Sequence, residues 1–154
     1  MAAPQAAEAN TPRHAVTATR PIGFWLKLVD RLIDEQFDRA LADYAVTRRQ
    51  WEVLNILSPG PSTLTRLNQE LEPFFGPPAR GSAAEDVAGL IDRGWVDVAF
   101  EYYELTGAGA IEHAELHRLV AKNRNAALAE LDQDDYAAAV RTLEHVARAL
   151  GWQS

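Results

Sequence analysis

The stretch that most restricts the fold runs from residue 82 to 106, SAAEDVAGLIDRGWVDVAFEYYELT, and changes character at a glycine. Ser82 and Glu85 have the spacing of a capping box, in which each side chain bonds the backbone N–H of the other at the start of a helix. Gly94 marks the end of that helix, because glycine adopts the left-handed backbone of a helix terminus at little steric cost. The first part of the stretch therefore predicts one short helix.

The second part of the stretch predicts a β-hairpin. Trp95–Val98 and Tyr102–Leu105 are rich in aromatic and β-branched side chains, which favour strands. Only Ala99-Phe100-Glu101 separates the two runs, so the expected strands are antiparallel neighbours joined by a very short tip.

A long helix is predicted over residues 21–45, far upstream of the hairpin. Its apolar side chains recur at steps of three and four residues, which is the helical period, and include Leu26, Val29, Ile33, Phe37, Leu41 and Tyr44. A second stripe of Trp25, Leu28 and Leu32 lies beside the first. Together the two stripes make an apolar surface broad enough to contact two surfaces.

The next helix has a complete start signal. Thr47 and Gln50 form a capping box, and Val46 and Trp51 occupy the positions of a hydrophobic staple. The helix runs to about Leu57, where the sequence SPGPS prevents its continuation.

The third helix follows at once, and its ends are also marked in the sequence. Ser62 is expected to cap the segment TLTRLNQELEPFF, and Pro73 is expected to fray it. The helix ends before Gly76, and the loop PPARG leads from there to the capping box at Ser82.

Two more helices are predicted after the hairpin. The first runs from Thr106 to about Leu131, and the second opens at Asp132 or Asp134 and closes at Gly151. A regular stripe of apolar residues follows the second helix: Tyr136, Val140, Leu143, Val146 and Leu150. The small central core cannot cover the apolar faces of these helices and of the first one, so a two-fold dimer is expected to bury them.

The order of elements predicts a mainly α protein, a winged helix-turn-helix with a short β-hairpin wing and a helical dimerisation region. We expect a winged-helix domain at 46–105 and a dimerisation region made of 21–45 and 106–154. The Ala-, Pro- and Thr-rich segment 1–20 is expected to be a disordered tail.

Composition narrows the classes of function. The chain of 154 residues is long enough for one domain, and its lack of cysteine excludes disulfides and thiolate chemistry. Without a signal peptide or a run of apolar residues long enough for a membrane, the cytoplasm is the expected compartment. The net charge of −7 disfavours non-specific binding to nucleic acids, although a local basic patch is still able to dock on DNA.

Three stretches in this order resemble the MarR family of winged-helix regulators: TRRQWEVLNIL, AGLIDRGWV and YELTGAG. The resemblance covers about residues 22–151. It implies a homodimer whose first and last two helices interlock, with the short helix after Ser82 presented to the major groove of double-stranded DNA. It also implies a small-molecule pocket where the dimerisation helices meet the winged domain.

The expected DNA-binding residues lie in the PPARG loop and in the segments on either side of it. Arg80 and Ser82 are candidates for phosphate or base contacts, and Thr63, Thr65 and Arg66 are candidates for contacts with the DNA backbone. Arg93, next to Gly94, is also a cation of this region, or else it bonds carbonyl groups at the end of its helix.

Charge in the same region departs from the family pattern. Family members carry a long basic wing, whereas no Lys or Arg lies between Arg93 and Arg118 here. The stretch 82–106 holds six acids against the single base Arg93. Glu85 and Asp86 also complement the helix dipole, so their presence has a structural explanation.

The candidate ligand site is a group of aromatic residues with one cationic anchor. We expect a small aromatic or hydrophobic ligand to bind among Phe24, Trp25, Tyr44, Arg48, Trp51 and Tyr102. The alternative is that these side chains are ordinary core and interface aromatics.

No metal, cofactor or catalytic motif is predicted. His113 and His117 share a helix face at the i, i+4 spacing, but no third ligand is identifiable and a solvated helix face is the preferred interpretation. No nucleophile elbow, phosphate-binding loop or dinucleotide fingerprint occurs, so the sequence gives no reason to expect an enzyme.

Three hypotheses for function remain. The first is a homodimeric, ligand-responsive, DNA-binding transcription regulator. The second is a MarR-like scaffold that binds a hydrophobic small molecule without DNA, as a carrier, sensor or biosynthetic catalyst. The third is an adaptor whose acidic face binds a basic protein.

Overall fold

The computed structural model describes residues 20–153, so nearly all of the tail expected at 1–20 lies outside the described residues. The chain folds into helices and one small sheet, which confirms the mainly α winged-helix class. In chain order the elements are α1 (Ile22–Leu41), the 3-10 turn η1 (Ala42–Tyr44), α2 (Arg48–Leu57), β1 (Ser62–Thr63), α3 (Leu64–Phe75), the 3-10 turn η2 (Pro78–Arg80), α4 (Ala83–Asp92), β2 (Val96–Ala99), β3 (Tyr102–Leu105), α5 (Gly107–Ala127) and α6 (Gln133–Ala149).

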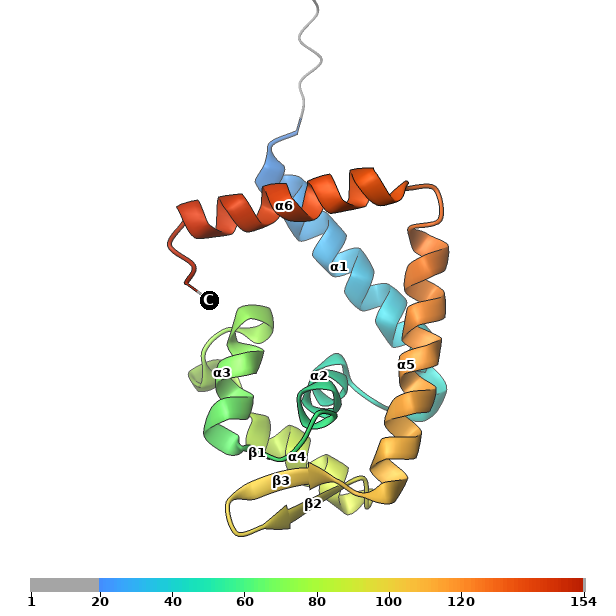
Figure 1. Cartoon of the computed structure of the whole chain (residues 1–154), viewed down its shortest axis with the longest axis vertical. Coiled ribbons are helices and arrows are strands. Elements are labelled where there is room, and N and C mark those ends of the chain that lie inside the picture. Colours follow the sequence, from blue (N-terminus) through green and yellow to red (C-terminus); the bar gives the residue numbers. More distant parts are fainter. Residues whose placement is uncertain (1–19, 154) are drawn as a thin grey trace, which may run out of the picture.

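The elements form two regions (Figure 1). Helices α2, α3 and α4 lie together with the sheet, and we call this group the winged unit. Helices α1, α5 and α6 lie along three sides of an open outline, and we call them the helical frame. Helix α6 crosses the end of the frame that is farthest from the sheet.

The hydrophobic core lies in the winged unit and reaches only the nearest parts of the frame. The buried apolar side chains are Phe37, Leu41, Val46, Trp51, Val53, Leu54, Leu57, Leu67, Leu71, Ala83, Val87, Leu90, Val96 and Leu116. The frame supplies Phe37 and Leu41 from the end of α1 and Leu116 from the middle of α5. Helix α6 contributes no buried residue.

The start of α2 agrees with the sequence prediction. The Gln50 N–H donates to Thr47 Oγ1 at 3.1 Å, and the Thr47 N–H donates to Gln50 Oε1 at 3.2 Å, which completes the capping box. Val46 and Trp51 are both buried, as a hydrophobic staple requires.

Two other predicted helix starts need correction. Thr63, not Ser62, caps α3 by accepting from the Arg66 N–H at 3.3 Å, although both residues also pair with β3 in the sheet. Ser82 does cap α4 and accepts from the Ala84 N–H at 3.2 Å, but no bond from Glu85 completes the predicted box. Pro73 does not fray α3 either: the helix continues through it to Phe75.

The sheet is three-stranded and antiparallel, in the order β1-β3-β2. The hairpin is present one residue later than predicted in its first strand, and Ala99 pairs with Tyr102 so that the tip is Phe100-Glu101. Phe100 has a left-handed backbone with φ of 59° and a fully exposed side chain. That conformation is unfavourable for a bulky residue.

The frame helices begin close to their predicted positions but are shorter. The last turn of the segment predicted as helix at 21–45 is the 3-10 turn η1, and α5 ends at Ala127 rather than near Leu131. Asp132, one of the two predicted starts, caps α6 by accepting from the Asp135 N–H at 2.7 Å. Gly151 follows α6 with a positive φ, as predicted for its end. Within residues 20–153, no helix has the length and apolar character needed to cross a membrane.

A close contact joins the wing to α5. The Thr106 N–H donates to the Trp95 carbonyl at 3.0 Å, and Thr106 Oγ1 donates to the Gly94 carbonyl at 2.7 Å. Gly109 packs so tightly that a Cβ added there would lie 1.9 Å from the Trp95 carbonyl oxygen. Only glycine permits this approach of helix to strand.

Candidate functional site

Two of the predicted DNA-binding residues present guanidinium groups at the surface beside α4. Arg66 on α3 has a side chain that is 67% exposed and pairs loosely with Glu70 at 3.5 Å. Arg80 ends η2, directly before α4, and is exposed. Among the described residues Arg80 has no carboxylate partner within ion-pair distance, so its charge is available to an anion.

The three predicted hydroxyl groups of this surface are in different situations. Thr63 Oγ1 accepts from the Arg66 N–H at 3.3 Å, and Ser82 Oγ accepts from Ala84 and contacts Asn68 Oδ1 at 3.5 Å. Thr65 is exposed on α3. Thr63 and Ser82 therefore cap their own helices, whereas Thr65 faces solvent.

The exposed face of α4 offers little to a base edge. Its outward residues include Ala84, Glu85, Ala88 and Asp92. Alanine has no hydrogen-bonding group, and a carboxylate is able to accept from a cytosine amino group but repels phosphate. The two cations of this surface thus lie on α3 and η2 instead of on α4.

One acid of α4 is neutralised inside the protein. Arg49 Nε donates to Asp86 Oδ2 at 2.9 Å, and these side chains are 24% and 13% exposed. Arg49 also donates to the Gly81 carbonyl at 2.9 Å and lies over the Phe75 ring at 4.9 Å. The negative charge facing outward from the first turn of α4 is therefore mainly that of Glu85.

Arg93 does satisfy carbonyl groups, but not those of its own helix. It donates to the Tyr44 carbonyl at 3.0 Å and to the Ala45 carbonyl at 2.7 Å, in the turn between α1 and α2. Its guanidinium also lies 4.9 Å over the Trp95 ring. Arg93 thus ties the end of α4 to the end of α1.

The wing adds acids and apolar groups to this surface. Val98, Phe100 and Tyr102 are exposed, together with the acids Asp97, Glu101 and Glu104. The wing therefore supplies no cation for a phosphate or for the minor groove.

The six predicted ligand residues do not share one cavity. Phe24 and Trp25 contact each other edge to face at 5.3 Å near the exposed start of α1. Arg48 is hydrogen-bonded to Asp34, and Trp51 is buried against Phe37 at 6.3 Å. The other two lie on separate elements, Tyr44 on η1 and Tyr102 on β3.

An apolar cleft lies instead between α1 and α5 and is closed at one end by Tyr136 of α6. Its volume is about 310 Å³. Its apolar walls include Val29, Ile33, Phe37, Val120 and Leu128, and its polar groups are Gln36, Asn123 and Arg124. Long apolar walls with a few polar groups are the usual composition of a small-molecule site.

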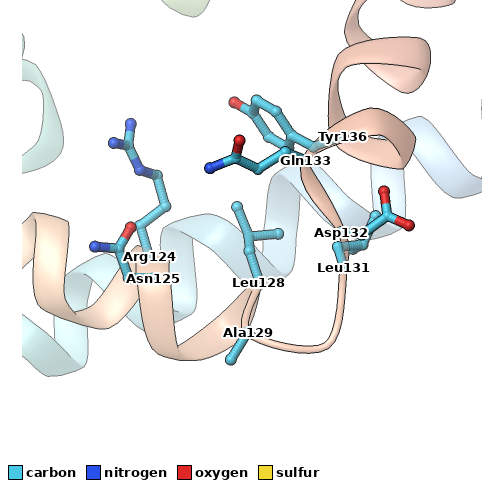
Figure 2. A pocket seen from close by; sticks show the side chains of 8 residues that line it. All are labelled: Arg124, Asn125, Leu128, Ala129, Leu131, Asp132, Gln133 and Tyr136. Atoms are coloured by element: carbon cyan, nitrogen blue, oxygen red, sulfur yellow. The ribbon is translucent and has the colours of Figure 1, made fainter.

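A second, more polar cavity of about 620 Å³ lies at the elbow between α5 and α6 (Figure 2). Gln133 and Tyr136 extend over Leu128, and the Arg124 guanidinium extends beside them. Arg124, Leu128 and Tyr136 line both cavities, so the elbow adjoins the cleft. Sequence periodicity singled out Tyr136 but not Asn123 or Arg124, because these two resemble any solvated helix face.

The prediction that His113 lies on a solvated helix face is wrong. Its ring stacks on Trp51 with centroids 5.3 Å apart, and its Nε2 lies 2.9 Å from Asn55 Oδ1. Burial, with a smaller contribution from the charge of His117, lowers the pKa of His113 from its ordinary 6.5. Within residues 20–153, no group of three His, Asp or Glu side chains is placed to hold a metal ion.

Solved structures show which known fold this architecture matches. MarR from E. coli superposes with a TM-score of 0.65 at 21% identity, over 82% of this chain and 96% of that protein. NadR superposes with a TM-score of 0.70 at 19% identity, over 84% and 96%. The transcriptional regulator PA3341 superposes with a TM-score of 0.70 at 24% identity, over 84% and 98%.

The chain has the MarR fold. The resemblance found in the sequence is thereby confirmed at the level of architecture, from α1 to the end of α6. No family model matches the sequence, and no curated protein matches it either. Another structure with the MarR fold is NadR in complex with 4-hydroxyphenylacetate, which superposes with a TM-score of 0.68 at 20% identity, over 84% of this chain and 96% of that one.

Proposed function

We propose that this protein is a homodimeric, ligand-responsive transcription regulator that binds double-stranded DNA. The observation that carries the proposal is a pair of exposed guanidinium groups in a MarR-like winged unit: Arg80 lies directly before α4, and Arg66 lies in the first turn of α3, which packs against α4. Phosphate contacts position such a unit on DNA, and arginine is well suited to make them.

The affinity for DNA depends on few cations. Each subunit offers two, so a dimer offers four against the acids of α4 and the wing. The logarithm of the binding constant falls by about 0.9 per phosphate contact for each tenfold rise in salt. We therefore expect specific binding to be weak and strongly reduced by salt.

Dimerisation is supported by the exposed apolar faces of the frame. Trp25, Val29 and Ile33 on α1 are about half exposed, as are Tyr136, Val140 and Leu143 on α6. Helix α6 packs on almost nothing in its own chain, and a groove between it and α3 is lined by Leu143, Leu150 and Trp152. A second copy that interlocks its frame with this one buries these faces.

The ligand we propose is a small aromatic acid, bound in the cleft between α1 and α5. The cleft has the volume and the apolar walls for one ring, and Arg124 is placed to pair with a carboxylate. NadR, with the same fold, binds the aromatic acid 4-hydroxyphenylacetate. Such a ligand acts as a signal only if its affinity differs between the DNA-binding form and the other form.

The proposal is tested by DNA binding to the region upstream of the protein's own gene, at several salt concentrations. Arg80→Ala removes one cation from each subunit, so the salt dependence should weaken by about two phosphate contacts. Glu85→Gln should strengthen binding, because it removes a repulsive charge. Arg118→Ala is the matched control, since Arg118 is an exposed arginine of α5 paired with Glu115.

The exposed alanines and acids of α4 favour a second candidate, the MarR-like scaffold that binds a hydrophobic molecule without DNA. Absence of a specific shift even at low salt, together with binding of aromatic acids that Arg124→Ala weakens, would establish this scaffold and reject the regulator. The acidic wing favours the third candidate, an adaptor for a basic protein. If the protein binds neither DNA nor an aromatic acid, the adaptor is the candidate that remains.

A further inference from the structure

Two neighbouring arginines in the first turn of α2 bind in opposite directions. Arg48 contacts α1 of the helical frame, and Arg49 contacts the start of α4 in the winged unit. We infer that this turn couples the position of the frame to the position of α4, with Arg48 and Arg49 as positioning residues. The inference deepens the proposed function, because it names the route by which ligand or dimer changes in the frame reach the DNA-facing surface.

The contact with the frame involves two turns of α1. Arg48 Nη1 pairs with Asp34 and lies 3.5 Å from Asp30 Oδ1. The side chain of Arg48 is only 20% exposed. Burial by itself lowers the pKa of Arg48, but the hydrogen bond with Asp34 and the charges of Asp34, Asp30 and Glu52 raise the pKa above its ordinary value, so the group stays charged.

The two aspartates of α1 alternate with residues of the cleft. Val29 and Ile33 line the cleft, and Asp30 and Asp34 are their immediate neighbours in the helix. A shift of α1 that accompanies filling of the cleft therefore moves the acids that hold Arg48. Each of the two aspartates is therefore adjacent in sequence to a side chain that lines the proposed ligand site.

The contact with the winged unit holds three segments at once. Arg49 bonds Asp86 in the first turn of α4 and the carbonyl of Gly81 in the preceding loop, while its guanidinium covers the ring of Phe75 at the end of α3. Arg80, a proposed phosphate ligand, is the residue before Gly81. Arg49 therefore sets where Arg80 and the N-terminus of α4 lie.

The turn that carries both arginines is held by contacts at both of its ends. Thr47 and Gln50 form a capping box on either side of the two arginines, and the next residue, Trp51, is buried in the core. Because the backbone between Arg48 and Arg49 is fixed in this way, a displacement of one guanidinium is passed to the other instead of being absorbed.

Hydrogen–deuterium exchange on the full chain tests the coupling without DNA or ligand. Arg48→Gln should raise exchange severalfold in residues 78–86, which Arg48 does not touch, and Asp86→Asn should raise exchange in residues 30–41 of α1. The matched control is Arg31→Gln, which breaks an exposed ion pair with Glu35 within α1 and should leave residues 78–86 unchanged. Asp34→Asn provides a second way to open the frame contact if Arg48→Gln folds poorly.

The inference is rejected if each variant changes exchange only in the elements that lost the ion pair. A uniform rise across α3 and α5 also rejects it, because that result reports general loss of stability.

DNA affinity adds a test in which the direction of the change in affinity decides between the two explanations. Arg49→Gln and Asp86→Asn both open the contact, but the first exposes a carboxylate and the second removes one. Both variants should lower affinity if the contact positions α4, whereas Asp86→Asn should raise affinity if charge alone matters. A parent protein that binds no DNA refutes the proposed function and leaves the exchange result to judge the coupling.

Discussion

The winged unit and the helical frame bury apolar side chains to very different extents. In the winged unit, side chains such as Leu54, Leu67 and Leu90 are completely buried and the surface is largely acidic. In the frame, α6 buries no residue and its apolar stripe is exposed. The difference indicates that the winged unit carries its own stability, while the frame depends on what it packs against.

The largest expected effect is the loss of stability when a buried side chain of the winged unit is truncated. Leu54→Ala should cost about 3 kcal/mol of unfolding free energy, because it opens a cavity in a fully packed core. Urea unfolding followed by tryptophan fluorescence measures this loss. A loss below about 1 kcal/mol would show that the core of the winged unit is loosely packed.

The joint between the two regions is tested by a pair of glycines in α5. Gly109→Ala should cost about 2 kcal/mol, because its Cβ collides with the Trp95 carbonyl. Gly107→Ala is the matched control: nothing lies within 4 Å of its Cβ, and alanine favours the helix, so stability should be equal or slightly higher. Equal thermal midpoints for the two variants would contradict the close contact.

Val140→Ala tests whether the frame gains its stability from a second copy. The change removes apolar area from the exposed stripe of α6 and should weaken dimerisation by about 1 kcal/mol per subunit. Sedimentation at several protein concentrations measures the shift in dissociation. Arg141→Ala, at the next position of the same exposed helix, should leave it unchanged; an equal effect of both would argue against the stripe as the interface.

The smallest expected effect is a pH dependence from His113. Its pKa is lowered in the folded protein, so the unfolded chain binds more protons in the range below 6.5. Stability should therefore be complete above pH 7 and decrease as the pH falls below the ordinary pKa towards the lower folded value. His113→Gln should flatten this slope in urea titrations, whereas His145→Gln on α6 should preserve it.

Much of the fold was predictable because its signals are local. The capping box at Thr47, the glycine after α4 and the stripe of α6 each depend on residues within a few positions of one another. The sequence around α3 did not identify its cap, because Ser62 and Thr63 are both suitable capping residues and both pair with β3.

The candidate site was less predictable because its decisive contacts are distant in sequence. Nothing near Arg49 shows that its partner is Asp86, so the sequence does not reveal that one of the six acids of residues 82–106 is paired inside the protein. Arg48 was expected to anchor a ligand and instead pairs with α1. Likewise, the cleft takes its walls from α1 and α5, whose periodicity indicates an apolar face but not what covers it.

The contact of Gly109 with Trp95 makes the wing and the first turns of α5 a single rigid arm. A small tilt at the far end of α5 must then displace the hairpin tip by a proportionate distance, without bending a loop. In a pair of such chains, the span between the two tips follows from the length and angle of a helix. Shortening α5 by a few residues would therefore change that span while every residue of α4 and the wing stayed the same.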